Sequence, residues 1–278
     1  DITKEFYKIA CSFNVNAGAE YTTVTIEGLQ DNFDKAVSLF ENVLANCKAD
    51  DAALKSLKSR ITKQRTDAKL NKGAILNGLT AYARYGAVNP TNNVLSAEEL
   101  NNVTSLELVA MLHNLNKYSH KILYYGPQPI AGLTTTLKKL HPVPAEFVAP
   151  PAKKTFTFAE QTKNQVLFAD YNMVQVETRW IRNNNTYNPA EEPLIAMFNN
   201  YFGGGMGALV FQTIRESKAL AYNTFAFYAV PDKKTDPFYT IAYVGSQADK
   251  FNESVAAMNE LLNAIPDVQS NIDFAKSS

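Results

Sequence analysis

The sequence predicts an α+β fold made of two incomplete copies of one strand-and-helix repeat. Three observations lead to this prediction. Segments typical of strands and of helices alternate along the 278 residues, four prolines between residues 141 and 153 interrupt the chain, and residues 21–44 resemble residues 239–262. A chain of this length buries about three quarters of its unfolded surface, so it needs neither a disulfide nor a metal to hold a core.

Composition excludes several classes of protein. Lys plus Arg and Asp plus Glu both number 27, and this zero net charge argues against a general nucleic-acid binder or a protein of anionic membrane surfaces. No apolar run reaches the ~18 residues of a membrane span. The 14 Tyr and 16 Phe argue against disorder. The two cysteines, Cys11 and Cys47, fit either a bridge or two free thiols.

The first elements are two strands and a helix. Aromatic and β-branched residues over 5–15 and 20–28 predict a hairpin or two neighbouring strands. A helix is predicted from about Asp31, because apolar residues follow it at helical spacing. Those residues are Phe33, Val37, Phe40 and Leu44.

A second helix is predicted to begin at Asp50 or Asp51, either of which can cap it, and the helical pattern continues towards Tyr85. Two short helices follow, each predicted from a capping box. The two capping-box pairs are Ser96 with Glu99 and Thr104 with Glu107.

The middle of the chain contains a predicted strand, a helix and a linker. Residues 121–125 are predicted to form a strand that ends at Gly126, and residues 129–140 an amphipathic helix. Residues 141–153 contain too many prolines for a helix or a central strand, so an extended linker is expected.

The second half is predicted to begin with strands and to continue with helices and strands in alternation. The predicted strands are 155–160, 165–171, 173–181, 221–230 and 238–244, and the predicted helices are 190–202, 209–217 and 248–264. The glycine-rich residues 203–207 (GGGMG) separate the first two of these helices.

The internal similarity has a constant offset of 218 residues. The matched residues are Phe33 with Phe251, Val37 with Val255 and Leu44 with Leu262. Common ancestry and a chance recurrence of strand and helix both stay open. If the period is real, residues 1–140 are the later part of one repeat, 141–153 a linker, and 154–278 the first part of the next. Neither repeat would then be complete.

Metal and phosphate sites find little support. The three histidines, His113, His120 and His141, lie in no HExxH or HxxEH motif, and no Cys–His cluster exists. The run YFGGGMG (201–207) lacks the patterns of phosphate-binding loops and predicts a turn that permits close backbone approach. The lysines and arginines of residues 55–72 indicate a solvated helix face, or alternatively a patch for an acidic partner.

The segment FNNYFGGGMGALVFQTIRESKALAYN (198–223) resembles the pitrilysin/insulinase zinc metallopeptidases, the inverzincins. Its most specific part is Arg215 with Tyr222 in the setting RESKALAY. The resemblance implies tandem α/β repeats with mostly antiparallel sheets flanked by helices. An unrelated α+β scaffold with a chance repeat is the remaining alternative.

In that family one half of a chamber binds zinc through HxxEH and a distant Glu, and the facing half supplies an Arg and a Tyr. The resemblance therefore implies that Arg215 binds backbone carbonyls of a peptide substrate and that Tyr222 donates to the scissile carbonyl or its oxyanion. Without the family, the favoured interpretation is structural: Arg215 satisfies carbonyls at the end of its helix, and Tyr222 packs as a strand residue.

The chain departs from the family pattern at the zinc site. Ile195, Phe198 and Asn199 stand in the places of His, Glu and His, and Gln64 stands in the place of the distant Glu. The resemblance thus implies the substrate-binding, chamber-forming half of a zinc endopeptidase that cleaves peptides or small unfolded proteins, inactive as this chain alone. The alternative is a non-catalytic partner or structural subunit of the same fold.

The expected partners are a peptide substrate and a zinc-binding repeat from the same parent chain or from a partner subunit. Zinc is expected in that other half and no cofactor in this chain. The likeness fits a four-repeat parent, with this chain joining the third and fourth repeats, or a two-repeat protein. It suggests a periplasmic or cell-envelope location, although the sequence itself leaves the compartment open.

Overall fold

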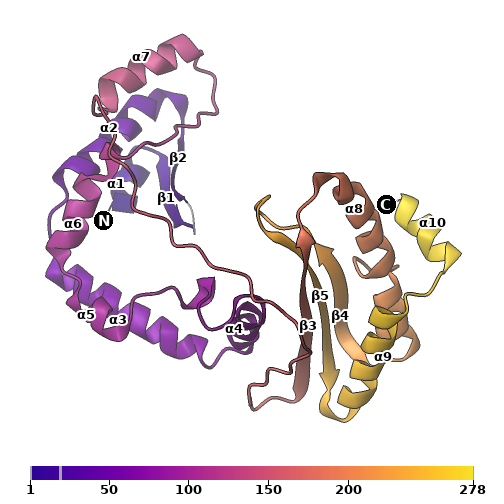
Figure 1. The fold of residues 1–278 in the computed structure, drawn as a ribbon. Coiled ribbons are helices and arrows are strands. Elements are labelled where there is room, and N and C mark those ends of the chain that lie inside the picture. Colours follow the sequence, from indigo (N-terminus) through magenta and orange to yellow (C-terminus); the bar gives the residue numbers. More distant parts are fainter. Residues whose placement is uncertain (1, 19–20, 278) are drawn as a thin grey trace. The chain divides into compact units, whose positions relative to one another are not determined.

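A computed structural model describes residues 2–18 and 21–277 and confirms the predicted α+β fold (Figure 1). The chain divides into two compact units. Unit 1 contains the described residues up to Lys63 together with Leu95–Thr155, and unit 2 contains Gln64–Val94 and the described residues from Phe156 onward. The division falls within helix α3 (Asp51–Ala68).

Unit 1 begins with helix α1 (Ile2–Lys8) and an antiparallel hairpin of β1 (Cys11–Ala17) and β2 (Thr22–Gly28). The strand predicted from residue 5 is therefore wrong over its first residues, and its companion's predicted start at residue 20 lies outside the described residues. The helix forms because Phe6 is fully buried and Lys8 pairs with Glu5 one turn away at 2.7 Å. Ala10, at a φ of 51°, then turns the chain into β1.

Helix α2 (Phe33–Asn46) follows a short 3₁₀ turn, η1 (Gln30–Asn32), and confirms the predicted helix. Phe6, Cys11 and Ala36 form a small core with partly buried apolar residues around them, and the rings of Phe6 and Phe13 stack 4.9 Å apart. A two-stranded hairpin alone is marginally stable in water, so this packing against α1 and α2 is what holds it.

Helix caps set the next elements as the sequence predicts. The Asp50 carboxylate accepts a hydrogen bond from the Ala53 N–H at 2.8 Å and so caps α3. Both capping boxes form, at α5 (Ala97–Asn102) and α6 (Ser105–His113). Hydrogen bonds from the Ser96 backbone and side chain hold the pKa of Glu99 below its usual value.

The helical pattern predicted towards Tyr85 is interrupted. It divides into α3 and α4 (Lys72–Tyr85), and Asn71 caps the second of them. A 3₁₀ turn, η2 (Pro90–Asn92), follows α4, and η3 (Leu115–Lys117) follows α6. The predicted helix at 129–140 is confirmed as α7 (Ile130–Leu140).

Three predicted strands are wrong as paired strands. Residues 121–125, 155–160 and 165–171 belong to no strand of the described chain. Leu123 and Phe168, in the first and third of these segments, are 93% and 82% exposed. A strand needs a neighbouring edge that supplies partners for its backbone N–H and C=O groups, and apolar alternation cannot supply that edge.

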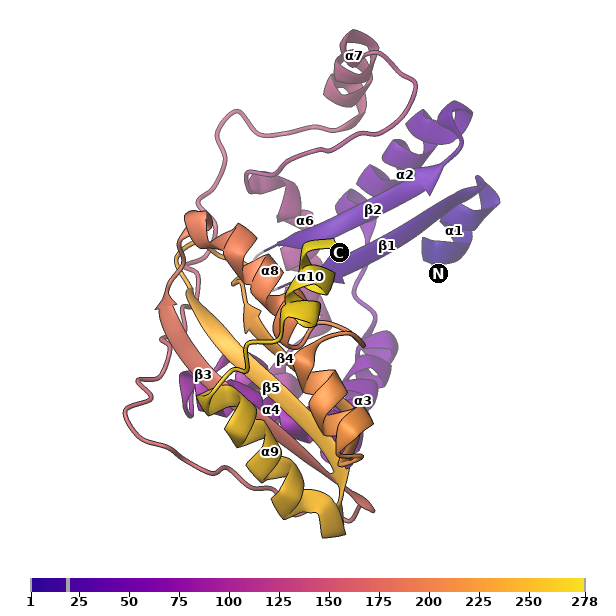
Figure 2. The ribbon, with the colours of Figure 1, turned by 90° about the vertical axis from the view of Figure 1, so that its right-hand side faces the viewer.

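Unit 2 is built on an antiparallel sheet with strand order β3-β5-β4. The strands are β3 (Gln175–Thr186), β4 (Ala221–Ala229) and β5 (Pro237–Gln247). A 3₁₀ turn, η4 (Pro189–Glu191), leads from β3 into the first covering helix. Helices α8 (Glu192–Phe202), α9 (Phe251–Asn263) and α10 (Gln269–Ser277) lie over one face of the sheet (Figure 2).

Helix α4 lies against the other face of this sheet, where the Arg179 guanidinium donates to Asn77 and Thr80 of α4. Burial of Arg179 lowers the pKa of its guanidinium. Residues on β5 alternate between the faces, so that Ala242 and Val244 enter the core under the helices and Tyr243 faces the opposite way.

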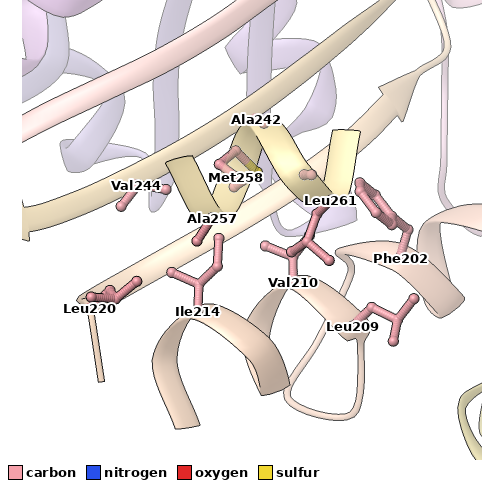
Figure 3. Packing of buried hydrophobic residues seen from close by; sticks show 11 residues of the cluster. Phe202, Leu209, Val210, Ile214, Leu220, Ala242, Val244, Ala257, Met258 and Leu261 are labelled. Atoms are coloured by element: carbon pink, nitrogen blue, oxygen red, sulfur yellow. The ribbon is translucent and has the colours of Figure 1, made fainter. Parts of the chain in front are cut away.

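The main core lies between the sheet and its helices (Figure 3). Its buried members are Phe202, Leu209, Val210, Ile214, Leu220, Ala226, Ala242, Val244, Ala257, Met258 and Leu261. Burying one such large apolar side chain contributes about 1.5–3 kcal/mol, so this layer dominates the stability of unit 2.

The two copies of the internal repeat have the same local structure. In each, a strand, a 3₁₀ turn and a helix follow one another: β2, η1 and α2 in the first, and β5, η6 (Ala248–Lys250) and α9 in the second. Helix α2 begins at Phe33 and α9 at Phe251, which keeps the offset of 218.

The glycine run between the helices permits close packing, as predicted. A Cβ placed on Gly203 would overlap the backbone N and O of Ala226 in β4, and one on Gly207 would meet the Phe274 ring at 2.7 Å. The end of α8 can therefore touch the β4 backbone only because residue 203 has no side chain.

Gly203→Ala should lower the free energy of unfolding of the chain by about 1–3 kcal/mol, because the sheet and α8 must move apart to admit the new methyl group. Chemical denaturation measures this change. Gly205→Ala is the matched control: a Cβ there has no atom within 4 Å. Equal stability for the two variants would contradict the packing described.

Candidate functional site

The two residues singled out by sequence, Arg215 and Tyr222, are joined by a π-helical turn. The turn η5 (Phe211–Ser217) is wider than an α-helix, since the Lys218 N–H donates to the Thr213 carbonyl five residues back, at 3.1 Å. Single π turns occur often at functional sites. Ala219, at a φ of 49°, ends the turn and directs the chain into β4.

Burial fixes the orientation of this turn. Ile214 is fully buried and Leu220 nearly so, and both belong to the main core. The neighbouring Arg215 therefore lies on the outer side of η5, where its side chain is 40% exposed. The core thus holds one side of the turn and leaves the other free to meet a ligand.

The structure brings Arg215 and Tyr222 together. The guanidinium carbon of Arg215 lies 5.3 Å from the ring centroid of Tyr222 and 4.8 Å from that of Phe211. Its Nε lies 3.5 Å from the Glu216 carboxylate. Stacking against two rings restricts the guanidinium and leaves its N–H donors available.

Tyr222 occupies an irregular point in its strand. The register between β4 and β5 shifts between Ala221 and Asn223, so Tyr222 lies outside the regular ladder, and it is 76% exposed. A side chain this exposed does not fit the alternative in which Tyr222 packs as an ordinary strand residue. Within residues 2–18 and 21–277, Arg215 makes no hydrogen bond to a carbonyl at the end of its turn.

Phe211 is a neighbour of the candidate pair that the sequence did not single out, and its ring contacts Arg215. It lies four residues before Arg215, a spacing that puts two side chains on one face of a helical turn. An aromatic ring at this spacing from an arginine is the signal that could have identified it.

The residues at the expected zinc positions serve the fold instead. Ile195 is buried in α8, and the rings of Phe198 and Phe202 stack 5.2 Å apart. The Asn199 amide donates to the Tyr228 carbonyl at 3.0 Å and accepts from its N–H at 2.8 Å, which ties α8 to β4. An aliphatic, an aromatic and an amide side chain held in this way do not fit zinc.

Gln64 does not complete a metal site either, since it is an exposed residue of α3. Across the part of the chain that the structure describes, no group of three or more His, Cys, Asp or Glu residues is arranged to hold a metal ion.

A groove of about 470 Å³ runs beside the segment that links the pair. Lys218 and Leu220 form one side of it, and α9 forms the other. The α9 residues are Glu253, Ala256, Ala257 and Glu260. Neither Arg215 nor Tyr222 lines this groove, which borders the link between them and not the pair itself.

This arrangement can bind a ligand rich in carbonyl oxygens. A guanidinium only donates hydrogen bonds, and a phenol at neutral pH donates readily through its O–H. An extended peptide presents a row of such oxygens along its backbone.

The basic run of residues 55–72 contributes partly to the fold. Lys58 donates to the carbonyls of Asn101 and Val103 at 2.7 Å each, and Lys72 pairs with Glu177 at 2.6 Å. Lys58 thus caps the end of a helix and Lys72 pairs with a strand. These structural roles fit a solvated helix face better than a patch for an acidic partner.

Comparison with known proteins places this geometry in context. The family model described as the peptidase M16 inactive domain matches residues 129–267, which is half of the chain. A search of curated proteins gave no match. No helix in residues 2–18 and 21–277 combines the length and the apolar character that a membrane crossing needs.

Solved structures share the fold at low identity. A peptidase M16 inactive domain from Pseudomonas fluorescens is 15% identical over 99% of this chain and 68% of its own, with a TM-score of 0.65. The periplasmic protease PqqL from Escherichia coli is 14% identical over 99% and 30%, with a TM-score of 0.73. Pitrilysin is 15% identical over 94% and 29%, with a TM-score of 0.57.

Replacing Arg215 by Ala or Tyr222 by Phe should change the free energy of unfolding by less than about 1 kcal/mol, because both side chains lie outside the core. Ile214→Ala, one residue away, should cost about 2–5 kcal/mol, since it empties a fully buried position. Urea denaturation of the three variants measures these changes in the free energy of unfolding. A loss of several kcal/mol for Tyr222→Phe would show that Tyr222 is structural.

Proposed function

The chain belongs to the peptidase M16 family, and from this premise we propose that it forms the substrate-binding, chamber-forming half of a zinc-dependent endopeptidase. The substrates would be peptides or small unfolded proteins. The chain spans 68% of the Pseudomonas fluorescens relative and about three tenths of the two proteases. The proposed activity would therefore belong to a larger assembly.

The observation that carries the proposal is the pairing of Arg215 with Tyr222 on an exposed surface. The core holds η5 through Ile214 and Leu220, and the guanidinium contacts the rings of both Phe211 and Tyr222. The Arg215 guanidinium and the Tyr222 hydroxyl both donate hydrogen bonds, so they favour a ligand that carries carbonyl oxygens.

Arg215 would position the substrate. Its guanidinium N–H groups would donate to backbone carbonyls of an extended peptide, which is recognition without regard to side-chain identity.

Tyr222 would act on the scissile bond. Its hydroxyl would donate to the scissile carbonyl oxygen, and this hydrogen bond strengthens as negative charge develops there. An interaction stronger in the transition state than in the ground state raises the turnover rate and not only the affinity.

Zinc would be held by residues outside this chain, in a zinc-binding repeat of the same parent or of a partner subunit. Ile195, Phe198, Asn199 and Gln64 provide no thiolate, imidazole or carboxylate. Zinc bound in the other half would supply an activated water.

A second candidate function is that of a non-catalytic partner or structural subunit of the same fold. The hydrogen bonds of Asn199 to Tyr228 favour it, because they use a ligand position to join α8 to β4. The proposal includes a periplasmic or cell-envelope location because one fold relative is named a periplasmic protease.

In the full enzyme that contains this chain, Tyr222→Phe should lower kcat by about 10²–10³-fold, the usual cost of losing one oxyanion donor. Arg215→Ala should mainly raise KM, because it removes contacts to the bound peptide. Peptide-cleavage kinetics measure both effects, and zinc content should stay unchanged.

Tyr125→Phe and Arg60→Ala are matched controls, because both residues are exposed and distant in sequence from the pair. Unchanged turnover in Tyr222→Phe and Arg215→Ala would refute the proposed roles. A parent that never cleaves peptides, whatever the variant, would favour the structural subunit instead.

The 278-residue chain alone should bind no stoichiometric zinc and hydrolyse no peptide, since residues 2–18 and 21–277 contain no arranged set of three His, Cys, Asp or Glu ligands. Metal analysis after dialysis and a peptide-cleavage assay test this expectation. Retention of one zinc per chain, or zinc-dependent cleavage, would contradict the assignment of the catalytic half to another segment.

A further inference from the structure

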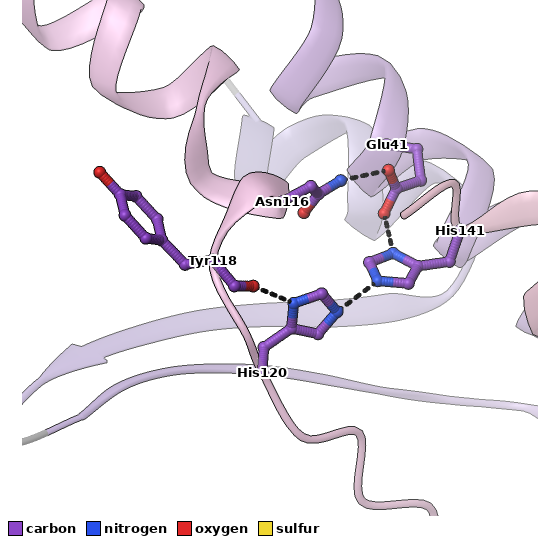
Figure 4. A network of polar contacts seen from close by, with 5 residues as sticks. All are labelled: Glu41, Asn116, Tyr118, His120 and His141. Carbon is purple, nitrogen blue, oxygen red and sulfur yellow. Dashed lines mark hydrogen bonds and ion pairs between the residues drawn. The ribbon is translucent and has the colours of Figure 1, made fainter. Parts of the chain in front are cut away.

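Unit 1 contains a chain of hydrogen bonds through two histidines that the proposed function does not use (Figure 4). The Nε2 atoms of His120 and His141 lie 2.7 Å apart. His141 Nδ1 lies 2.6 Å from the Glu41 carboxylate, and His120 Nδ1 lies 2.8 Å from the Tyr118 carbonyl. Both outer partners are acceptors.

The outer partners fix where the ring protons are. A carboxylate and a carbonyl oxygen accept hydrogen bonds, so each Nδ1 must carry a proton. Two neutral imidazoles in this tautomeric state would place two lone pairs against each other between the Nε2 atoms. A separation of 2.7 Å is a hydrogen-bond distance, which requires a proton in that position.

We propose that His120 and His141 share one proton between their Nε2 atoms and form a pH-dependent clasp at the base of the segment 121–140. The pair then carries one positive charge. The Glu41 carboxylate, whose side chain is 13% exposed, supplies the matching negative charge and accepts a second hydrogen bond from Asn116 at 2.9 Å. A buried carboxylate paired in this way avoids the cost of an isolated charge.

The clasp has a defined position in the chain. His120 precedes the segment 121–140, and His141 directly follows α7, which forms its second half. The pair closes this segment at its base, while Glu41 fastens the base to α2. Further along, the Tyr124 hydroxyl donates to Gln30 at 2.7 Å, and the Tyr124 and Phe33 rings lie 5.5 Å apart.

The elements that carry the pair and its partners also contain other charged or titratable residues. Besides Glu41, they are Asp34 and Lys35 of α2, Glu107 and His113 of α6, Lys117 of η3, Lys121 of the segment before α7, Lys138 and Lys139 of α7, and Glu146 of the segment after it. Among the described residues, Glu41 is the charged group that hydrogen-bonds a ring nitrogen of the pair. The Phe147 ring packs edge-on against His120 at 5.8 Å.

Loss of the shared proton should open the clasp. The two lone pairs then repel, and one histidine must turn away from its outer partner. Above about pH 6.5, the ordinary pKa of histidine, the two histidines of the unfolded chain together bind less than one proton, so sharing one proton in the folded state makes stability fall as pH rises in that range. The segment 121–140 should then become more mobile, while the main core of unit 2 is unaffected.

The test compares urea denaturation of the 278-residue chain with its variants between about pH 7 and 9, above the ordinary pKa of histidine. One extra native-state proton makes the unfolding constant rise by up to about tenfold per pH unit. His120→Gln should lose this dependence. His113→Gln, which removes a histidine whose Nε2 contacts only the Cys47 carbonyl, should keep it.

A measurement on the unaltered chain covers the case in which His120→Gln does not fold. Long-range ¹H–¹⁵N NMR of the histidines near pH 6 should show both Nδ1 atoms protonated and one proton shared by the Nε2 atoms. Hydrogen exchange, corrected for its intrinsic pH dependence, should then show protection of 121–140 falling as pH rises, while α9 keeps its protection.

Three results would overturn the proposal. The first is a neutral pair near pH 6, with one histidine protonated at Nε2 only. The second is the same pH dependence of stability in His120→Gln as in the unaltered chain. The third is micromolar Zn²⁺ binding that needs both histidines, which would show that the two lone pairs serve a metal ion.

Discussion

The end of α8 touches the backbone of β4 at Gly203, and the candidate site depends on this contact. Because residue 203 has no side chain, the helix end approaches Ala226 closely enough for Asn199 to bond both backbone groups of Tyr228. Leu209, Val210 and Ile214 can then reach the core after only a few residues of turn. The start of η5, and hence the direction in which Arg215 leaves it, follows from that placement.

The same core separates buried from exposed residues within one short segment. Ile214 and Leu220 are buried, whereas Arg215 and Tyr222 lie outside and contact each other. A π turn and a strand irregularity bring about this division. An exposed Arg–Tyr pair on a rigidly held turn can meet an extended peptide without rearranging the core. Unit 1 relies more on polar contacts, because its hairpin and helices share only a small apolar core.

Much of the fold could be predicted from sequence, because it is set by local signals. The capping boxes at Ser96 and Thr104 and the apolar stripe of α2 each specify one helix through contacts within a few residues. The strands predicted at 121–125 and 165–171 failed because pairing needs a partner edge that local pattern does not reveal. Residue 5 was misassigned because burial of Phe6 and the Glu5–Lys8 pair favour a helix over a strand.

The site was predictable only in part. The setting RESKALAY identified Arg215 and Tyr222 through a family resemblance, but their contact depends on the π turn and on the register shift, which no spacing rule gives. Phe211 was missed for the same reason.

The central claim is that the Arg215–Tyr222 pair contacts substrate. The most direct test is a structure of the full zinc-loaded enzyme with an uncleaved peptide bound. The account predicts the Tyr222 hydroxyl within about 3 Å of the scissile carbonyl oxygen, and the Arg215 guanidinium bonded to a peptide carbonyl. A bound, cleavable peptide that contacts neither residue would contradict it.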